Sequence, residues 1–352
     1  MADISYSVTT DMNNMLQMVY TREEVDRAVF QMEALKAPGP DGLLPLFFQH
    51  YWKIIGDEVS VAILNCLNLG SFPQSLNNTF ITLIPKVKSP SLVSKFRPIS
   101  LCNTFYKIVS KVVANRLKGI LPNLISESQS AFQTDKAISD NILVAFETLH
   151  HMKNQKLKKK GFLALKLDMS KAYDRVEWGF LKKVMEKMGF GEKWVKLIME
   201  CISTVSYSIL VNGEPKGDIK PSRGIRQGDP LSPSLFLLCS EGLNRMLQAT
   251  AREDEIRGFS LCRNGPRISH LFFADDTLLF TRAVMGDLAK IQEILTLYEQ
   301  ASGQQINRGK TTIFFSKVVT EERKEEISNF LEVEEVKEYE KYLGLPAMVG
   351  KK

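Results

Sequence analysis

The sequence predicts an α+β fold in which an antiparallel sheet is backed by helices. Short apolar stretches bounded by turn residues alternate with longer helical patterns from residue 161 onward. The chain contains no internal repeat and no low-complexity linker. Its 352 residues, 44% apolar and 24% charged, are ordinary for a globular protein and can bury a large core. One extended domain, or two lobes that share a cleft, is therefore expected.

The first helix is predicted from its start signal. Thr21 and Glu24 have the T-x-x-E spacing of a capping box, so we expect a helix from Arg22 to about Leu35. The stretch "KAPGPDG", residues 36–42, is rich in proline and glycine and should end this helix.

The other elements follow from patterns of the same kind. In chain order they are a helix over 50–70, a strand ending at Pro85, a helix over 105–117, a solvated lysine-rich loop over 153–160, a strand ending at Asp168, helices near 177–188 and 192–205, a hairpin over 206–219, a helix after Pro230 and a hairpin over 270–280. One side of the helix over 105–117 is apolar, and Lys107 and Lys111 lie one turn apart on another side.

Composition excludes several classes of protein. The five cysteines lie far apart, without a CxxC pair or histidines spaced to complete a zinc site. The N-terminus lacks the basic and apolar regions of a signal peptide, and no apolar run approaches the ~18 residues of a membrane span. We therefore expect a soluble intracellular protein, in the nucleus or the cytoplasm, without a membrane partner.

The positive charge is concentrated in one part of the chain. Residues 81–166 carry fifteen Lys and Arg against four Asp and Glu, a net charge of +11, whereas the whole chain carries +6. Such a block favours contact with a polyanion or a triphosphate, because basic side chains that neutralise phosphates release counterions. A solvated surface is the alternative.

Two adjacent carboxylates stand between the apolar runs of "HLFFADDTLLF", residues 270–280. Asp275 and Asp276 could simply form the turn of a hairpin, because aspartate bonds readily to turn backbone. A second apolar strand, however, delivers Asp168 at its end. Three carboxylates at strand ends favour a site for two Mg²⁺ ions, with Mn²⁺ as an alternative, of the kind that supports nucleotidyl transfer.

A glycine-rich stretch lies between these acidic motifs. In "GIRQGDPLSPSLF", residues 224–236, Gly224 and Gly228 allow close backbone approach, and Pro230 can occupy the first turn of a helix. This arrangement suits contact with a nucleotide, although an ordinary turn at the start of a helix would have the same pattern.

Nine short motifs occur in the order seen in one known family. They are "KAPGPDG", "LIPKV", "FRPISL", "QSAF", "LDMSKAYDRV", "GIRQGDPLSP", "FADD", "INRGK" and "YLGLP". Over roughly residues 15–350, the sequence resembles the reverse transcriptases of LINE-type retrotransposons, which lack long terminal repeats, most closely those of plants. The resemblance implies the fingers and palm of a right-hand polymerase, with Asp168, Asp275 and Asp276 as the metal-binding triad.

The resemblance also implies roles in binding the nucleotide and the template. It makes Arg97, Lys107 and Lys111 candidates for gripping the triphosphate or the template. Gln227 and Gly228 would line the incoming nucleotide.

Three further roles are implied near the reacting groups. Tyr173 would stack under the deoxyribose, and Lys310 would donate a proton to the departing pyrophosphate. The motif "YLGLP", residues 342–346, would be the primer grip. A packing role for Tyr173 and a plain surface position for Lys310 are the alternatives.

The implied organisation and partners are those of a polymerase segment. The domains are an N-terminal extension over 1–20, fingers with the start of the palm over 21–166, the palm over 167–320, and the end of the palm with the primer grip over 321–352. The partners are an RNA template with a DNA primer, deoxynucleoside triphosphates (dNTPs), and the endonuclease, thumb and RNase H domains of a polyprotein.

The sequence departs from the family pattern in places, and two other functions stay open. Thr134, Asp135 and Lys136 replace a common Pro-Gly-Arg step. The chain ends just past the primer grip, so the thumb is expected to be absent, as is an endonuclease before residue 20. A non-catalytic, nucleic-acid-binding remnant is therefore one alternative. An RNA-dependent RNA polymerase is the other, although such enzymes usually have a carboxylate where this chain has Tyr173.

Overall fold

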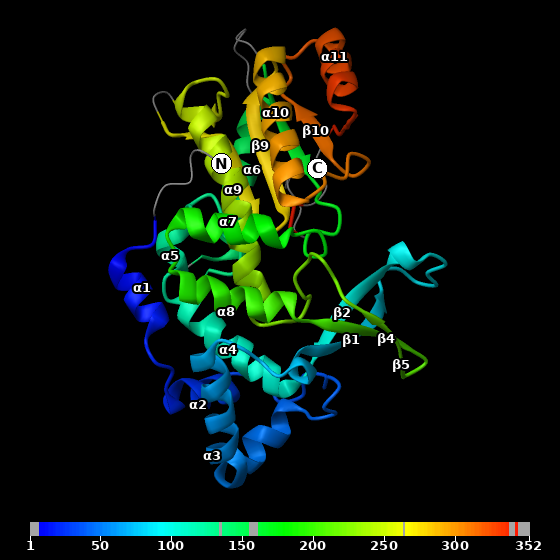
Figure 1. Ribbon diagram of the computed structural model, residues 1–352. Coiled ribbons are helices and arrows are strands. Elements are labelled where there is room, and N and C mark those ends of the chain that lie inside the picture. The colour runs from blue at the N-terminus through cyan, green and yellow to red at the C-terminus, as the bar shows by residue number, and fades with distance from the viewer. Residues whose placement is uncertain (1–6, 134–135, 155–160, 263–264, 338–341, 344–352) are drawn as a thin grey trace. The chain divides into compact units, whose positions relative to one another are not determined.

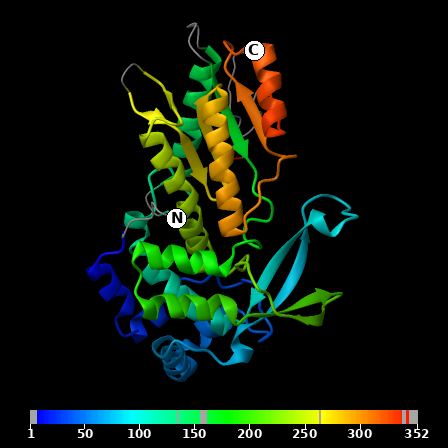
Figure 2. The same cartoon turned by 45° about the horizontal axis from the view of Figure 1, so that its top comes forward.

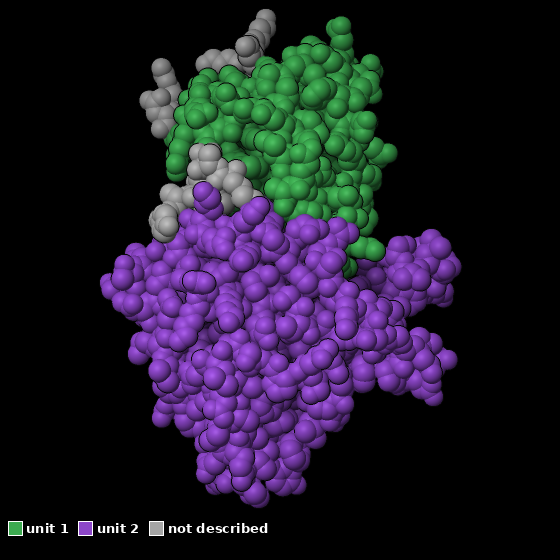
Figure 3. Space-filling view, in the orientation of Figure 1, with its two compact units in different colours: residues 1–4, 125–175, 237–352 green, residues 5–124, 176–236 purple. Residues whose placement is uncertain are grey.

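A computed structural model describes most of the chain and divides it into two compact units. The described residues are 7–133, 136–154, 161–262, 265–337 and 342–343. Unit 1 is built from 125–175 and 237–352, and unit 2 from 5–124 and 176–236 (Figure 3). Each unit thus combines segments that are far apart in the sequence.

Unit 2 contains most of the helices that precede residue 237. Its helices are α1 (Thr10–Gln17), α2 (Arg22–Phe30), α3 (Pro45–Leu69), α4 (Thr104–Lys118), α5 (Leu121–Leu124), α7 (Trp178–Met188) and α8 (Glu192–Ser203), with short 3₁₀ helices at Gln74–Asn77 and Val93–Lys95. Its strands are β1 (Asn78–Pro85), β2 (Phe96–Cys102), β4 (Ser206–Val211) and β5 (Glu214–Ile219). Helix α9 (Ser232–Arg252) begins in unit 2 and continues into unit 1.

The predicted start of α2 is confirmed, but its end is earlier than expected. The backbone N–H of Thr21 donates to Glu24 Oε2 at 3.0 Å, as a capping box requires. The helix ends at Phe30, and the side chain of Gln49 donates to the carbonyl oxygens of Val29 and Met32. These contacts supply donors to carbonyls at and just beyond the C-terminus of α2, where the helix itself provides few.

The sheet of unit 2 has the strand order β2-β1-β4-β5. The predicted strand ending at Pro85 and the predicted hairpin over 206–219 are both present, as β1 and as β4 with β5. The two hairpins are joined by a parallel pairing of β1 with β4, in which Phe80 lies opposite Ser208. Figure 1 shows these four strands projecting from the helices of the same unit.

Unit 1 is centred on a five-stranded sheet. Its elements are α6 (Ile138–Asn154), β3 (Phe162–Leu167), β6 (Phe259–Ser260), β7 (Arg267–Ile268), β8 (His270–Phe273), β9 (Asp276–Arg282), α10 (Met285–Ser302), β10 (Thr312–Phe315), α11 (Glu321–Leu331) and β11 (Glu334–Glu335). The strand order is β11-β10-β3-β9-β8, and β3 pairs antiparallel with both β9 and β10. An antiparallel sheet backed by helices is thus confirmed.

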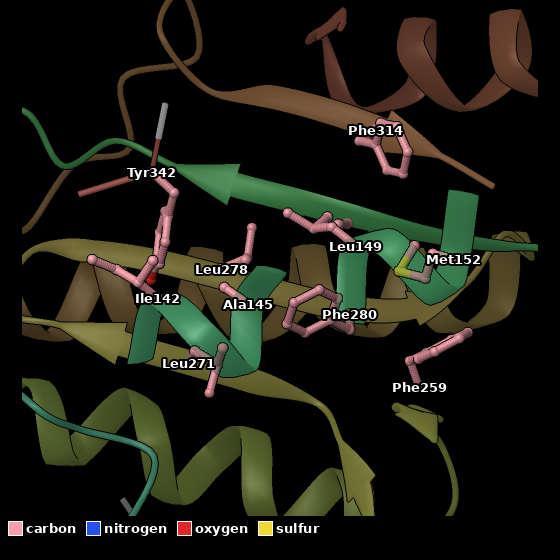
Figure 4. Close-up of a cluster of buried hydrophobic side chains, with 11 residues drawn as sticks. Ile142, Ala145, Leu149, Met152, Phe259, Leu271, Leu278, Phe280, Phe314 and Tyr342 are labelled. Atoms are coloured by element: carbon pink, nitrogen blue, oxygen red, sulfur yellow. The ribbon is translucent and has the colours of Figure 1, made fainter. Parts of the chain in front are cut away.

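Both faces of this sheet are covered. Figures 1 and 2 show α10 in front of the strands and α6 behind them. Ala164 and Phe280, paired across β3 and β9, pack with Leu149 and Met152 of α6 in one buried cluster (Figure 4). Leu163, Leu165 and Leu167 alternate with these residues and so project from the opposite face. Each fully buried side chain of this size contributes about 1.5–3 kcal/mol.

The length and apolarity of the described helices decide whether any of them could span a membrane. None of the helices in the described part of the chain is both long and apolar enough to cross a bilayer. Of the lysine run at 153–160, residues 155–160 lie outside the described residues, so the loop expected there stays a prediction.

Candidate functional site

Two acidic motifs become neighbours through strand pairing. Strand β3 ends at Leu167, which pairs with Thr277 of β9. Continuing the same antiparallel register by one residue sets Asp168 opposite Asp276. In an antiparallel sheet such residues point to the same face. The strand-end position predicted for both aspartates is therefore correct, and the sheet brings them together.

The third aspartate belongs to a tight turn. Phe273 of β8 pairs with Asp276 of β9, so only Ala274 and Asp275 connect the strands. Ala274 has φ 54°, in the left-handed region that disfavours residues with a Cβ by about 1–2 kcal/mol. A non-glycine residue held in this conformation indicates that contacts around the turn impose its shape.

The electrostatics of the hairpin favour a cation. Asp276 is half-buried, and burial together with the negative charges of Asp275 and Asp168 raises the pKa of its carboxyl, while Lys166 acts in the opposite direction. Asp275 is exposed. A divalent cation would remove the repulsion among these carboxylates.

The donors suit Mg²⁺ or Mn²⁺ in their chemistry, because both ions prefer oxygen ligands and Mg²⁺ commonly takes one or two carboxylates. Among the residues that the structure describes, however, no three His, Cys, Asp or Glu side chains already form a ligand group. Gathering Asp168, Asp275 and Asp276 around one ion therefore requires side-chain movement from the positions seen here. The backbone arrangement fits the ion, whereas the side-chain arrangement is not preassembled.

The "INRGK" motif and the residues before it support the backbone after β3. The N–H of Asn307 donates to the carbonyl oxygen of Asp168 at 2.8 Å, and the N–H of Asp168 donates to Thr311 Oγ1 at 3.3 Å. The buried side chain of Gln304 donates to the carbonyl oxygen of Ala172 at 2.8 Å. These bonds fix the segment that runs from Asp168 to the residue before Tyr173.

Tyr173 lies near the hairpin carboxylates. Burial raises the pKa of its hydroxyl, and the negative charge of Asp275 raises it further. The structure therefore brings Tyr173 within electrostatic reach of Asp275. Lys310 is exposed, and its backbone N–H donates to the carbonyl oxygen of Asn307 at 3.0 Å.

The "GIRQGDP" loop of unit 2 is held by a buried ion pair that the sequence analysis missed. Arg226 Nη2 lies 3.0 Å from Asp229 Oδ2, with 2% of each side chain exposed. Asp229 also accepts from the hydroxyls of Tyr106 and Ser110. The motif itself was a signal, because an Arg and an Asp three residues apart flank the predicted nucleotide contacts.

The predicted nucleotide contacts in this loop are Gln227 and Gly228. The carbonyl oxygen of half-buried Gln227 accepts from the N–H of Ser100 in β2 at 2.9 Å. Gly228 has φ 109°, and a Cβ there would lie 3.2 Å from the carbonyl oxygen of Ser100. A side chain at position 228 would therefore be strained, which explains the glycine.

The three basic candidates of unit 2 differ in exposure. Arg97 is exposed on β2, and Lys111 is half-buried on α4. Lys107 is 3% exposed, and its Nζ donates to the carbonyl oxygen of Ala37 at 2.6 Å. The ammonium group is thus buried and bonded to the "KAPGPDG" loop, and its expected grip on a phosphate stays a prediction.

The "YLGLP" motif, predicted to be the primer grip, reaches the same sheet as the aspartates through Tyr342. Tyr342 is buried in the cluster of Figure 4, and its hydroxyl donates to Asn141 Oδ1 at 2.9 Å. Residues 344–346 of the motif lie outside the described residues, as do Thr134 and Asp135. Lys136, the third departure from the family pattern, donates to the carbonyl oxygens of Glu127 and Gln129.

Comparison with known proteins bears on this geometry. The family model described as "Reverse transcriptase (RNA-dependent DNA polymerase)" matches residues 84–346, which include every aspartate of the site. The chain belongs to the reverse transcriptase family. The resemblance seen in the motifs is thereby confirmed.

Named relatives of this reverse transcriptase chain come from mobile elements. It is 30% identical over 297 residues to "Transposon TX1 uncharacterized 149 kDa protein" of Xenopus laevis, covering 84% of this chain and 22% of that protein. It is 26% identical over 280 residues to the "Retrovirus-related Pol polyprotein from type-2 retrotransposable element R2DM" of Drosophila melanogaster, covering 78% of this chain and 25% of that protein.

A third relative is named as a polymerase. The chain is 25% identical over 294 residues to the "RNA-directed DNA polymerase from mobile element jockey" of Drosophila melanogaster, covering 80% of this chain and 30% of that protein. The reverse transcriptase chain thus spans between about a fifth and a third of the length of these relatives.

Proposed function

We propose that this chain is the polymerase part of a retrotransposon protein without long terminal repeats, and that it copies RNA into DNA. The observation that carries the proposal is the pairing of Leu167 with Thr277, the neighbours of Asp168 and Asp276, inside the region matched by the reverse transcriptase family. The relatives named as Pol polyproteins and as an RNA-directed DNA polymerase support this assignment.

The three aspartates would hold two Mg²⁺ ions, with Mn²⁺ as an alternative. Bound there, the ions would polarise the primer 3′-hydroxyl and neutralise the departing pyrophosphate. The chain's own contribution is to hold the carboxylates at strand ends of a sheet that helices cover on both faces. The backbone of Asp168 is fixed there by Asn307 and Thr311. A fixed backbone at Asp168 would limit how far the carboxylates must move when the ions bind.

The other candidate residues keep their expected roles in the proposal. Tyr173 would bear on the sugar of the incoming dNTP, Gln227 and Gly228 would line that nucleotide, and exposed Lys310 would donate a proton to pyrophosphate. Arg97 and Lys111 would contact the phosphates of the RNA template or the DNA primer.

The domain assignment is kept as part of the proposal. Residues 21–166 would supply the fingers and residues 167–320 most of the palm, although each structural unit draws on both ranges. Endonuclease, thumb and RNase H functions would come from other parts of a longer polyprotein, since the relatives are several times longer than the matched segment.

Primer extension tests the proposal. Wild-type protein, given Mg²⁺, dNTPs and an RNA template with a DNA primer, should extend the primer. Asp275→Asn should abolish extension, because an amide is a poorer Mg²⁺ ligand than a carboxylate. Asp254→Asn is the matched control, since Asp254 belongs to the same unit but pairs with Arg267 at 2.7 Å on the surface.

The outcomes distinguish the candidate functions. Extension by wild type and by Asp254→Asn, but not by Asp275→Asn, would support the polymerase. Binding of the primed template without extension would favour the non-catalytic remnant. Extension with ribonucleotides in preference to dNTPs would favour the RNA polymerase.

A further inference from the structure

The "QSAF" motif lies against the strand that leads into the acidic turn. Gln129 forms an isolated parallel bridge with Phe272 of β8. The N–H of Phe272 donates to the carbonyl oxygen of Ser128 at 2.8 Å, and the N–H of Ser130 donates to the carbonyl oxygen of Phe272 at 3.1 Å. This segment therefore covers the edge of β8, two residues before Ala274.

The side chain of Gln129 reaches the turn itself. Gln129 is 2% exposed, and its Oε1 accepts from the N–H of Ala274 at 3.1 Å and from the N–H of Ala131 at 2.9 Å. Ala274 is the buried residue with positive φ that directly precedes Asp275. The contact thus holds the one turn residue whose conformation would otherwise be disfavoured.

The backbone of Gln129 is held by two further side chains. The carbonyl oxygen of Gln129 accepts from Gln133 Nε2 at 2.8 Å and from Lys136 Nζ at 2.9 Å. Upstream, Ser126 is tied to α9, since its hydroxyl donates to Glu241 Oε1 at 2.7 Å. A glutamine anchored in this way can set the position of the turn and does not merely follow it.

We propose that Gln129 is a positioning residue for the metal ligands, acting through the backbone of Ala274 on Asp275 and Asp276. It contacts neither the ion nor the nucleotide. Its role resembles that of the hydrogen-bonded groups behind the ligands of other metal sites, which fix ligand orientation and thereby affinity. The inference rests on the proposed function, because it assumes that these aspartates bind a divalent cation.

The test compares two substitutions of the same kind. Gln129→Met keeps the length of the side chain and removes the acceptor for Ala274. Gln133→Met removes a donor to the same segment and leaves the bond between Gln129 and Ala274 in place. Urea unfolding of both variants establishes that each is folded and how much stability each has lost.

The main readout is Mn²⁺ binding without nucleic acid, followed by the electron paramagnetic resonance signal of free Mn²⁺. Gln129→Met should raise the dissociation constant by about tenfold, which is the usual scale for loss of a supporting partner of a metal ligand. Gln133→Met should raise it by much less, because the bond between Gln129 and Ala274 stays in place and Lys136 still donates to the carbonyl oxygen of Gln129. A folded Gln129→Met protein with the wild-type dissociation constant would overturn the proposal.

A second readout does not depend on any variant. Amide hydrogen exchange in the wild-type protein should show Ala274 protected to the same degree as the ladder amides of β9, because its N–H is bonded to a buried acceptor. Exchange of Ala274 at the rate of an exposed loop would overturn the proposal. Both readouts are independent of polymerase activity, so a failure of primer extension alone would refute the proposed function and not the role of Gln129.

Discussion

The side-chain amide of Asn141 donates to the carbonyl oxygen of Phe272 at 2.9 Å, which ties α6 to the strand that enters the acidic turn. The same side chain accepts from the hydroxyl of Tyr342. Asn141, which is 3% exposed, therefore links the first residue of the "YLGLP" motif to the sheet that bears the aspartates.

Replacing Asn141 should destabilise unit 1 more than removing the hydroxyl of its partner. Asn141→Ala leaves the hydroxyl of Tyr342 without its acceptor, and an unsatisfied buried group costs about 1–3 kcal/mol. It also removes one of the two donors to the carbonyl oxygen of Phe272, the other being the N–H of Ser130. Tyr342→Phe removes one bond only and should cost less. Urea unfolding measures both free energies, and equal losses in the two variants would contradict the bridging role of Asn141.

Substitution of Tyr173 should change sugar discrimination. Tyr173→Val should raise incorporation of ribonucleotides relative to deoxyribonucleotides, because the smaller side chain leaves room for a 2′-hydroxyl. Tyr173→Phe retains the ring and serves as the control. Single-nucleotide insertion with paired dNTP and rNTP gives the ratio, and a folded Tyr173→Val protein with unchanged discrimination would show that Tyr173 only packs.

Substitution of three basic residues should distinguish those that contact phosphates from the one that is structural, through the salt dependence of nucleic-acid binding. Arg97→Ala and Lys111→Ala should each make the negative slope of log K against log salt for a primed template less steep by about 1. This change is expected for the loss of one phosphate contact. Lys107→Met should leave the slope unchanged and lower the free energy of unfolding, because Lys107 is bonded to Ala37. A less steep slope for Lys107→Met would support its predicted contact with phosphate.

Protonation of His270 should make the free energy of unfolding depend on pH. Burial lowers its pKa to about 4, and its Nε2 lies 2.6 Å from Asn244 Oδ1, so the neutral ring donates there. The unfolded chain, with a pKa near 6.5, takes up the proton first. The contribution of neutral His270 to the free energy of unfolding is therefore complete above about pH 6.5. It falls by about 3 kcal/mol as the pH drops to 4.

A variant that cannot titrate isolates this effect. His270→Gln can still donate to Asn244 but gains no charge in acid. The unfolding free energy of wild type minus that of His270→Gln should therefore fall by about 3 kcal/mol between pH 7 and pH 4. A difference that stays constant over this range would show that His270 is not the group responsible.

The sequence predicted the positions of the three aspartates in the fold well, because the signals for them are local. An apolar strand that ends at Asp168 and a hairpin that turns at Asp275 can both be recognised from a few neighbouring residues. Their pairing through β3 and β9 also follows once an antiparallel sheet is assumed. The parallel pairing of β1 with β4 could not be predicted, because its strands are separated by more than a hundred residues with no local signal.

The burial of Lys107 could not be predicted for a related reason. Helical periodicity places Lys107 on a side of α4 that is free of apolar residues, but it cannot show which loop covers that side. In the fold, the "KAPGPDG" loop docks there, with Asp41 accepting from the N–H of Thr104 at the start of α4. Gly39 permits this close approach, because a Cβ would lie 2.3 Å from the backbone of Cys102.

The place of β3 at the centre of its sheet also has a consequence for synthesis on the ribosome. Both strands that flank β3 come later in the chain, β9 at Asp276–Arg282 and β10 at Thr312–Phe315. Until more than a hundred further residues have been translated, this apolar strand has neither neighbour, and such non-local pairing is slow and exposes strand edges. The nascent chain therefore passes through a long interval in which β3 needs protection from other chains, whether by chaperones or by transient contacts with residues already made.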